Sequence, residues 1–457
     1  MIRSQRGLRT NVVAVIAIAL ALSACSPATT SPSPNGTGAS GSASPAGSQT
    51  FVYAVPSVPT TLDYATYEGD ANYVTPSPMV AVDAHTVELH VNTATSLDVA
   101  DLSVNWFIIY DSQEAKQHAT AADPWAKAWL AKNSDTFGPW HVSAFDPGNQ
   151  ITYVQNQYYW GPRGNISTFI LKAVPDAGVR GQLLQSGAVD WAARLTFAQY
   201  GNLQGTSGVT VKQCVSPNRD DLVLQQKGTK FADLRVRQAI SLAIDRAALV
   251  KGAYQGYYKP AVTGLTQFYQ FSPPYATYEY NVATAKQLLA EAGYPNGFDM
   301  TLTYNDSRPG PWADQSSALI KSMLAQVGIN VTLKLVGSYT DFNTQFVSGA
   351  FEAVLYQEPP LIADPYFSAA IYNVSTSFQN HFGFKDPAYD ELVYQIAHSP
   401  AGTDRDALVS KLADLGVTDY PVIYLTDDVY LNAYRSNISG IQWDPSGDLM
   451  PSEYTKQ

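Results

Sequence analysis

The sequence has few cysteines and a low share of charged side chains. Cys25 and Cys214 are the only cysteines among 457 residues, so a framework of several disulfides is excluded. Charged residues make up 15%, and acidic residues outnumber basic ones by 39 to 28 without any basic run. Nucleic acid is therefore a poor partner, and we expect none. Stability must come from hydrophobic cores, for which the length is ample, so we expect two lobes and an inert, buried Cys214.

Common signatures of catalysis and metal binding are also missing. The sequence contains no G-x-S-x-G and no H-E-x-x-H motif, which are typical of hydrolases. Its six histidines form no pair at the i, i+3 or i, i+4 spacing that places two ligands on one helix face. We expect no enzyme activity, no cofactor and no metal site. A secreted hydrolase that uses paired carboxylates is the alternative.

The N-terminus carries the one long apolar run. Val12–Leu22 is almost wholly apolar and follows three arginines within the first nine residues, which is the layout of a secretory signal. The run is too short to span a hydrocarbon core of about 30 Å comfortably. Leu22-Ser23-Ala24-Cys25 resembles a bacterial lipobox. That resemblance implies cleavage before Cys25, a diacylglycerol on its sulfur, and an extracytoplasmic protein anchored to the cell membrane.

The remaining pattern alternates between strands and helices. Period-2 alternation predicts strands at 87–91 and 151–154, and a 3.6-residue apolar stripe predicts a helix over 235–250. Another helix is expected over 283–292, stopped by Gly293. The stretches 300–304, 317–327 and 330–335 form a strand, a helix and a strand, which favours parallel pairing. An α/β fold is predicted.

Several segments resemble one known family in the family's own order. They are Gly138-Pro139-Trp140, Asp146-Pro147-Gly148, Asn156 to Gly161, Gly187 to Asp190, Phe231 to Ile240 with Ala243 to Arg246, Tyr280 to Tyr294, Asp364 to Phe367, Asp386 to Asp390 and Pro421 to Tyr424. The sequence is similar to the extracellular solute-binding proteins of family 5, the peptide- and nickel-binding components of ABC transporters. The resemblance implies a type II periplasmic-binding-protein-like fold, in which crossing hinge strands join two lobes around a ligand cleft. It also implies a monomer that serves an ABC permease and its ATPase without catalysis of its own.

The resemblance sets the expected division of the chain. The expected parts are a lipoprotein signal peptide at 1–24, a Ser/Pro/Gly-rich tether at 25–49, a first lobe at 50–222 plus 430–457, and a second lobe at 223–429. Family members have a segment of several tens of residues after a "tLDp" strand. Here Thr86-Val87-Glu88-Leu89 follows Asp63 after only about two dozen positions. We therefore expect a trimmed first lobe with a more open site, and the alternative is that an ancestral binding protein has lost function.

Candidate ligand contacts also follow from the resemblance. Peptide-binding relatives hold the ligand's α-ammonium with an acidic residue shortly before a "DPxxF" turn. Leu361 stands at that position, and Glu358 lies three residues upstream, where a solvated loop carboxylate is its alternative role. The expected ligand-binding residues are Glu358, Tyr356, Trp312, Trp140 and Asp364. The aromatic residues could equally belong to the core, and Asp364 could cap a turn. A di- or oligopeptide is the leading solute, and a nickel chelate or another non-peptide solute is the alternative.

Overall fold

A computed structural model describes residues 49–56, 58, 79–81, 83, 87–89, 111–269, 274–360, 362, 364–442 and 449–457. The predicted signal peptide, Cys25 and most of the tether lie outside these residues, as does the segment around Asp63 where a deletion is expected. Those predictions therefore stay predictions.

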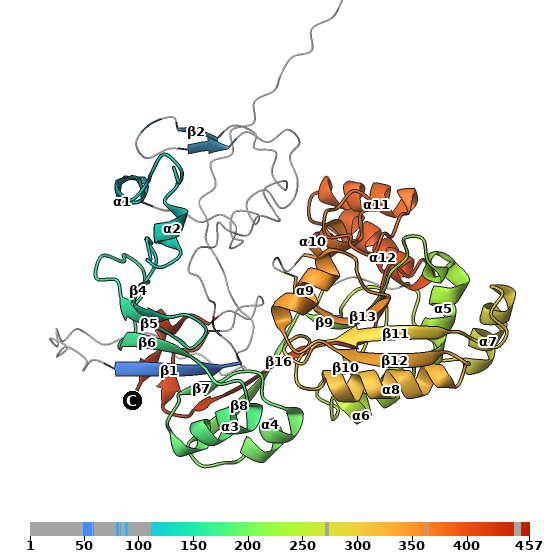
Figure 1. The fold of residues 1–457 in the computed structure, drawn as a ribbon, viewed down its shortest axis with the longest axis horizontal. Helices are drawn as coiled ribbons and strands as arrows, with labels where there is room; N and C mark the ends of the chain where they lie inside the picture. Colours follow the sequence, from blue (N-terminus) through green and yellow to red (C-terminus); the bar gives the residue numbers. More distant parts are fainter. Residues whose placement is uncertain are drawn as a thin grey trace, which may run out of the picture. The chain divides into compact units, whose positions relative to one another are not determined.

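The first large sheet has seven strands and mixed pairing (Figure 1). In spatial order the strands are β4 (Trp140–Asp146), β5 (Gln150–Gln155), β6 (Ile166–Ala173), β1 (Gln49–Val55), β7 (Trp191–Ala192), β16 (Val429–Arg435) and β8 (Val209–Val215). β1 runs parallel to β6 and β7, whereas the other neighbours are antiparallel. Strands from both ends of the chain thus share one sheet.

Two helices pack on the first sheet. In α3 (Ala177–Ser186) the Asp176 side chain accepts from the Val179 N–H at the start, and Gly187 ends the helix with a φ of 77°, a left-handed conformation that glycine adopts readily. α4 (Phe197–Leu203) begins with a complete capping box between Thr196 and Gln199. Apolar residues of both helices join residues of β1, β7 and β16 in one core. Cys214 is buried in β8 and takes part in no disulfide, so its predicted burial is confirmed, and its inertness stays a prediction.

The second large sheet has five strands and helices on both faces (Figure 1). In spatial order its strands are β12 (Asn330–Leu335), β11 (Asp299–Tyr304), β13 (Ala353–Glu358), β9 (Arg219–Leu224) and β14 (Ile423–Tyr424). The helices are α5 (Leu234–Ala243), α6 (Arg246–Ala253), α7 (Val282–Glu291), α8 (Ala313–Ala325), α9 (Tyr339–Val347), α10 (Pro365–Ser368), α11 (Pro387–Ala397) and α12 (Thr403–Thr418). Every residue of β9 and β13 is buried, as expected for strands covered on both faces.

The period-2 alternation of these central strands separates two cores. Leu222 and Leu355 point into a core built with α5, α6, α7 and α8. Val223 and Tyr356, one residue along each strand, point into a core built with α9, α11 and α12. Side chains of β9 and β13 therefore take different neighbours according to whether their position is odd or even.

Smaller elements complete the described part. They are β2 (Met79–Ala81) paired with β3 (Val87–Leu89), β10 (Lys259–Pro260) with β15 (Thr426–Asp427), β17 (Ile438–Ser439) with β18 (Thr455–Lys456), the helices α1 (Ser112–Gln117) and α2 (Lys127–Leu130), the 3₁₀ turns Lys230–Ala232 and Pro451–Glu453, and a π turn at Ala369–Asn373. Across the described residues, no helix combines the length and the hydropathy that crossing a membrane requires.

Most predicted elements are present. The unit predicted over 300–335 is observed as β11, α8 and β12, and β11 pairs with β12 in parallel. The single helix predicted over 235–250 is wrong, because the structure has two helices there. Ile244 takes an extended conformation (φ −97°, ψ 111°), and the Asp245 carboxylate accepts from the Ala248 N–H at 2.9 Å to begin α6. The apolar stripe continues through this break, which is why its period suggests one helix.

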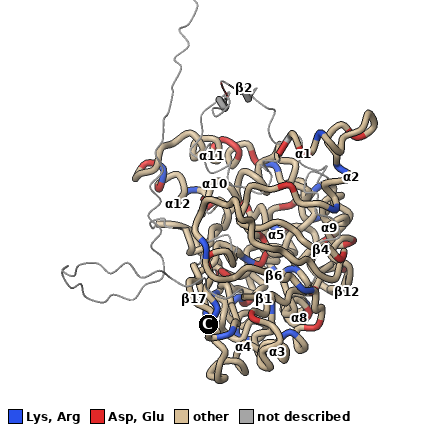
Figure 2. The backbone as a smooth tube through the Cα atoms, turned by 90° about the vertical axis from the view of Figure 1, so that its left-hand side faces the viewer, with Lys and Arg blue, Asp and Glu red and all other residues tan. Residues whose placement is uncertain are grey.

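The chain passes twice between the two sheets. Ser216–Asn218 connect β8 to β9, and Asp428 connects β15 to β16. Residues 221–224 lie within β9, and the stretch 424–430 contains the Asp428 crossing. Acidic and basic residues are interspersed along the elements in Figure 2, without a basic stripe on the described part.

Candidate functional site

The two crossing segments lie side by side. The Asp428 N–H donates to the Asn218 carbonyl at 3.0 Å. The Tyr430 hydroxyl donates to Asn218 Oδ1 at 3.2 Å, although these residues lie 212 positions apart. These hydrogen bonds fix the side chains of both segments at one place.

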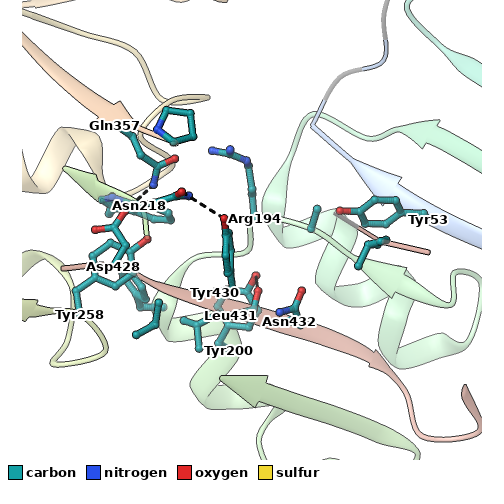
Figure 3. Close-up of a pocket in the computed structure, with 16 residues that line it drawn as sticks. Tyr53, Arg194, Tyr200, Asn218, Tyr258, Gln357, Asp428, Tyr430, Leu431 and Asn432 are labelled. Atoms are coloured by element: carbon teal, nitrogen blue, oxygen red, sulfur yellow. Dashed lines mark hydrogen bonds between the residues drawn. The ribbon is translucent and has the colours of Figure 1, made fainter. Parts of the chain in front are cut away.

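A pocket of about 280 Å³ opens beside these segments (Figure 3). Its lining comes from both sheets and their helices: Tyr53, Ala193, Arg194, Phe197, Tyr200, Asn218, Tyr258, Trp312, Gln357, Pro359, Asp428, Val429, Tyr430, Leu431, Asn432 and Leu449. The volume lies near the lower end of the range for small-molecule pockets. The mixture of aromatic rings and convergent polar groups is typical of such pockets.

One wall of the pocket carries a buried carboxylate, that of Asp428. Its Oδ1 accepts from the Thr426 hydroxyl at 2.7 Å. Its Oδ2 accepts from the Gln357 amide at 2.8 Å (Figure 3). Only 4% of Asp428 is exposed. Burial raises the pKa of Asp428 well above its ordinary value, and the neighbouring Asp220 raises it further.

Asp220 lies behind the same wall and is fully buried. Its Oδ2 accepts from the Tyr254 hydroxyl and from Trp312 Nε1, each at 2.9 Å. Burial raises the pKa of Asp220 to about 7, against the lowering effect of these donors. Its Oδ1 has no hydrogen-bond partner among the described residues.

Aromatic rings from both parts of the chain form the second wall. Trp312 precedes α8 and lies 4.9 Å from the ring of Phe197, which opens α4 in the other part. Tyr258 meets Phe197 at 5.2 Å and Trp312 at 5.6 Å, edge to face in both cases. Such packing favours defined ring positions.

Arg194 links the two parts at the rim. It follows β7 with a left-handed φ of 46°, and one guanidinium nitrogen donates to the carbonyls of Ser307 and Pro309 at 2.9 and 3.2 Å. Ser307 and Pro309 belong to the loop that follows β11. Arg194 is thus the exposed cation of the pocket lining.

Glu358 and Tyr356, two of the predicted ligand contacts, lie on the opposite face of β13 from Gln357. Glu358 is 3% exposed and pairs with Arg219, its partner across the strands β13 and β9. Tyr356 stacks on Phe346 at 4.4 Å and supports the Arg308 guanidinium, which lies 4.7 Å from its ring centre. Neither residue lines the pocket. Their role as ligand contacts stays a prediction.

The other three predicted contacts lie in different places. Trp312 lines the pocket. Trp140 begins β4 and packs beside Phe169, 6.0 Å away. Asp364 caps α10 and forms an ion pair with Arg405 at 2.8 Å, so its alternative role as a cap is observed. Of the five predicted residues, the structure brings Trp312 alone to this pocket.

The sequence does contain a signal for the residues that were missed. Asp220-Asp221 and Asp427-Asp428 are acidic pairs beside strongly apolar strands, where carboxylates are rare. That pattern marks them as candidates for a buried site. No described cluster of three or more His, Cys, Asp or Glu residues could hold a metal ion.

Comparison with known proteins places the chain in a family. Residues 41–380 match the family described as bacterial extracellular solute-binding proteins, family 5 Middle. The chain belongs to this family, so the resemblance inferred from its motifs is confirmed.

Curated relatives are distant and longer. Heme-binding protein A of Haemophilus influenzae is 25% identical, over 80% of this chain and 67% of its own length. The dipeptide-binding protein of Escherichia coli K12 is 23% identical, over 81% and 70%. The glutathione-binding protein GsiB of the same strain is 24% identical, over 66% and 60%. The chain therefore spans about 60–70% of the length of these relatives.

Solved structures show the same fold. The periplasmic binding protein DppA from Helicobacter pylori, in complex with peptide STSA, gives a TM-score of 0.75 at 21% identity, covering 83% of this chain and 74% of that one. NikA from Staphylococcus aureus, in complex with Ni(L-His)2, gives 0.71 at 19%, covering 84% and 79%. The predicted type II periplasmic-binding-protein fold is confirmed.

Proposed function

We propose that this chain is the solute-binding component of an ABC importer and captures short peptides outside the cell membrane. A single observation carries the proposal: one pocket takes its lining from both sheets at the two crossing segments. A solute there contacts Trp312 and Gln357 of one part and Arg194 and Tyr430 of the other. Such a solute favours the arrangement in which both parts contact it.

The chemistry of the pocket supports peptides over other solutes. A peptide carries both charges and amide groups, and the lining offers a carboxylate, a guanidinium, the amides of Gln357 and Asn218, and several aromatic rings. The volume of about 280 Å³ suits a dipeptide better than a large macrocycle. Dipeptide-binding relatives agree with this choice.

Delivery completes the proposed function. The solute-loaded form is presented to a permease, and the permease's ATPase drives import. The chain acts as a monomer without catalysis of its own, held near the permease by a lipid on Cys25. The tether after Cys25 raises the local concentration of the receptor beside its partner.

Native mass spectrometry and calorimetry of the mature protein with di- to tetrapeptides test the proposal. We expect one peptide per chain. Trp312→Ala is expected to weaken binding by at least about tenfold, whereas Trp160→Ala, at a side chain 89% exposed and outside the pocket lining, leaves it unchanged. Circular dichroism verifies that both variants fold. Copurification of another solute without peptide binding would refute the peptide assignment, and turnover of a peptide or glycoside would make the chain an enzyme.

A further inference from the structure

Two carboxylates at the pocket, Asp428 in its lining and Asp220 behind it, form no ion pair among the described residues. The recorded donors to Asp428 and Asp220 are Thr426, Gln357, Tyr254 and Trp312, all of them neutral. The recorded ion pairs include neither aspartate. The Gln357 amide donates to Asp428 Oδ2 and also lowers the pKa of Asp220. Neutral donors alone stabilise a buried charge poorly.

On the opposite face of β9, the carboxylate of Asp221 does form an ion pair. Asp221, one residue along, receives the Arg219 Nε at 3.2 Å, and the same guanidinium pairs with Glu358. Asp220 forms no such ion pair, and its buried Oδ1 lacks a hydrogen bond, as does Oδ1 of Asp221. On the pocket face the cation is Arg194, which lowers the pKa of Asp220 but forms no ion pair with it. A cation that enters the pocket can therefore act as the missing ion-pair partner.

The aromatic wall of the pocket indicates the chemical class of the cation that would bind there. Trp312 and Tyr258 present rings beside the carboxylates, and aromatic faces attract organic cations. No described cluster of His, Cys, Asp and Glu suits a metal ion. An alkylammonium group, with three N–H donors and an apolar stem, matches carboxylate oxygens flanked by rings.

We propose that the pocket binds an alkylammonium group of its solute against the Asp428 carboxylate, with Asp220 behind it and the rings of Trp312 and Tyr258 beside it. This assignment rests on the proposed solute-binding function and adds the charge that the solute must carry. The N-terminal ammonium of a peptide and the amine of a lysine side chain share this chemistry.

Proton release accompanies this binding. The groups that face Asp428 are Asp220 and Asp221 of β9, Tyr254 and Tyr258 after α6, and Arg194 at the rim. In the empty pocket, burial raises the pKa of Asp428 and so favours its protonated form. An incoming ammonium stabilises the carboxylate, lowers this pKa and releases the proton. Affinity for an ammonium solute therefore rises with pH across the range in which Asp428 loses its proton.

Small probes test the ammonium site without assuming that the solute is a peptide. We expect n-butylammonium to change the tryptophan fluorescence of the wild type at millimolar concentration, whereas n-butanol does not. Asp428→Asn removes the charge and keeps an acceptor for Gln357, so the response to n-butylammonium is lost. Asp427→Asn is the matched control, because the Asp427 carboxylate accepts from the Gln267 N–H, outside the pocket. Equal responses to both probes, or an unaltered response of Asp428→Asn, would overturn the ammonium site.

Peptide probes distinguish the two sources of the ammonium group. Calorimetry compares Ala-Ala, N-acetyl-Ala-Ala and N-acetyl-Ala-Lys. Loss of at least about tenfold on acetylation of Ala-Ala assigns the site to the N-terminus, and recovery with N-acetyl-Ala-Lys assigns it to a side chain. Equal binding of all three overturns the ammonium site and leaves solute binding intact. Binding of n-butylammonium without any peptide refutes peptide capture and retains the site.

Discussion

Asp220 shows how one buried carboxyl group makes stability depend on pH. Its side chain is fully buried, its donors are neutral, and its pKa is raised to about 7, compared with about 3.9 in an unfolded chain. At pH values between these two pKa values, Asp220 therefore keeps its proton in the folded protein, whereas the same side chain has lost its proton in the unfolded chain. Asp427, with a pKa raised to about 6 by burial, acts in the same direction.

We predict that Asp220→Asn flattens part of the pH profile of stability. Asp220 contributes its full stabilisation below about pH 4, and this is lost as pH rises towards about 7, at up to about 1.4 kcal/mol per pH unit. Asparagine has no proton to lose, so the variant's free energy of unfolding falls less over this range. Urea unfolding between these values measures the slope. Asp404→Asn, at an exposed position of α12, is the control and should keep the wild-type slope; equal slopes for all three proteins would contradict the pKa of Asp220.

At the scale of elements, the lack of a side chain at Gly416 allows α12 to pack closely against the segment at Gly264. A Cβ at Gly416, inside α12, would lie 2.3 Å from the Gly264 Cα. The Gly264 N–H donates to the Ala413 carbonyl of the same helix at 3.2 Å. Glycine in a helix costs about 1 kcal/mol relative to alanine. Here close packing of two backbones outweighs helix propensity.

We expect opposite effects of the same substitution in two helices. Gly416→Ala should destabilise the protein by about 1–3 kcal/mol because it overpacks the contact with Gly264. Gly181→Ala in α3 should stabilise it by about 0.4–1 kcal/mol, since a Cβ there meets nothing within 4 Å. Thermal and urea unfolding compare the two variants. A stable Gly416→Ala protein would show that the segment at Gly264 moves away at little cost.

The break between α5 and α6 belongs to the same scale. Periodicity predicts the existence and type of most elements, because burial of one face imposes it. It misses this break because both helices bury residues in the same core. The local hydrogen bond from Ala248 N–H to Asp245 decides the boundary.

For the whole molecule, the proposed anchor and the binding part are separable. The described sheets and the pocket begin at Gln49, beyond Cys25 and most of the tether. Two acyl chains on one residue suffice for stable attachment to a membrane. Anchoring should therefore affect where the protein resides and not what it binds.

Cys25→Ser is predicted to release the protein from the membrane fraction of the expressing bacterium. Its affinity for solute in calorimetry should equal that of the wild type. Cys214→Ser, at the buried thiol of β8, is the control and should stay with the membrane. Retention of the Cys25→Ser protein in washed membranes would show that the anchor is not a lipid on this residue.

The sequence by itself determined the family, the α/β class and most elements. These properties follow from local signals: motif order, the period of apolar residues, and caps such as Gly187 and Asp364. Local signals also favoured Glu358 and Tyr356 as ligand contacts, since both lie in the segment before the "DPxxF" turn.

Only the tertiary structure decided which side chains meet in the pocket. Strand alternation turns Gln357 to the pocket and leaves Glu358 on the far face, where Arg219 pairs with it. Asp428 donates a backbone hydrogen bond to Asn218, about two hundred positions away in the sequence, because β9 and β16 begin where the chain crosses between the sheets. The register of a strand and the partner of a buried charge depend on distant residues, and a local pattern contains neither.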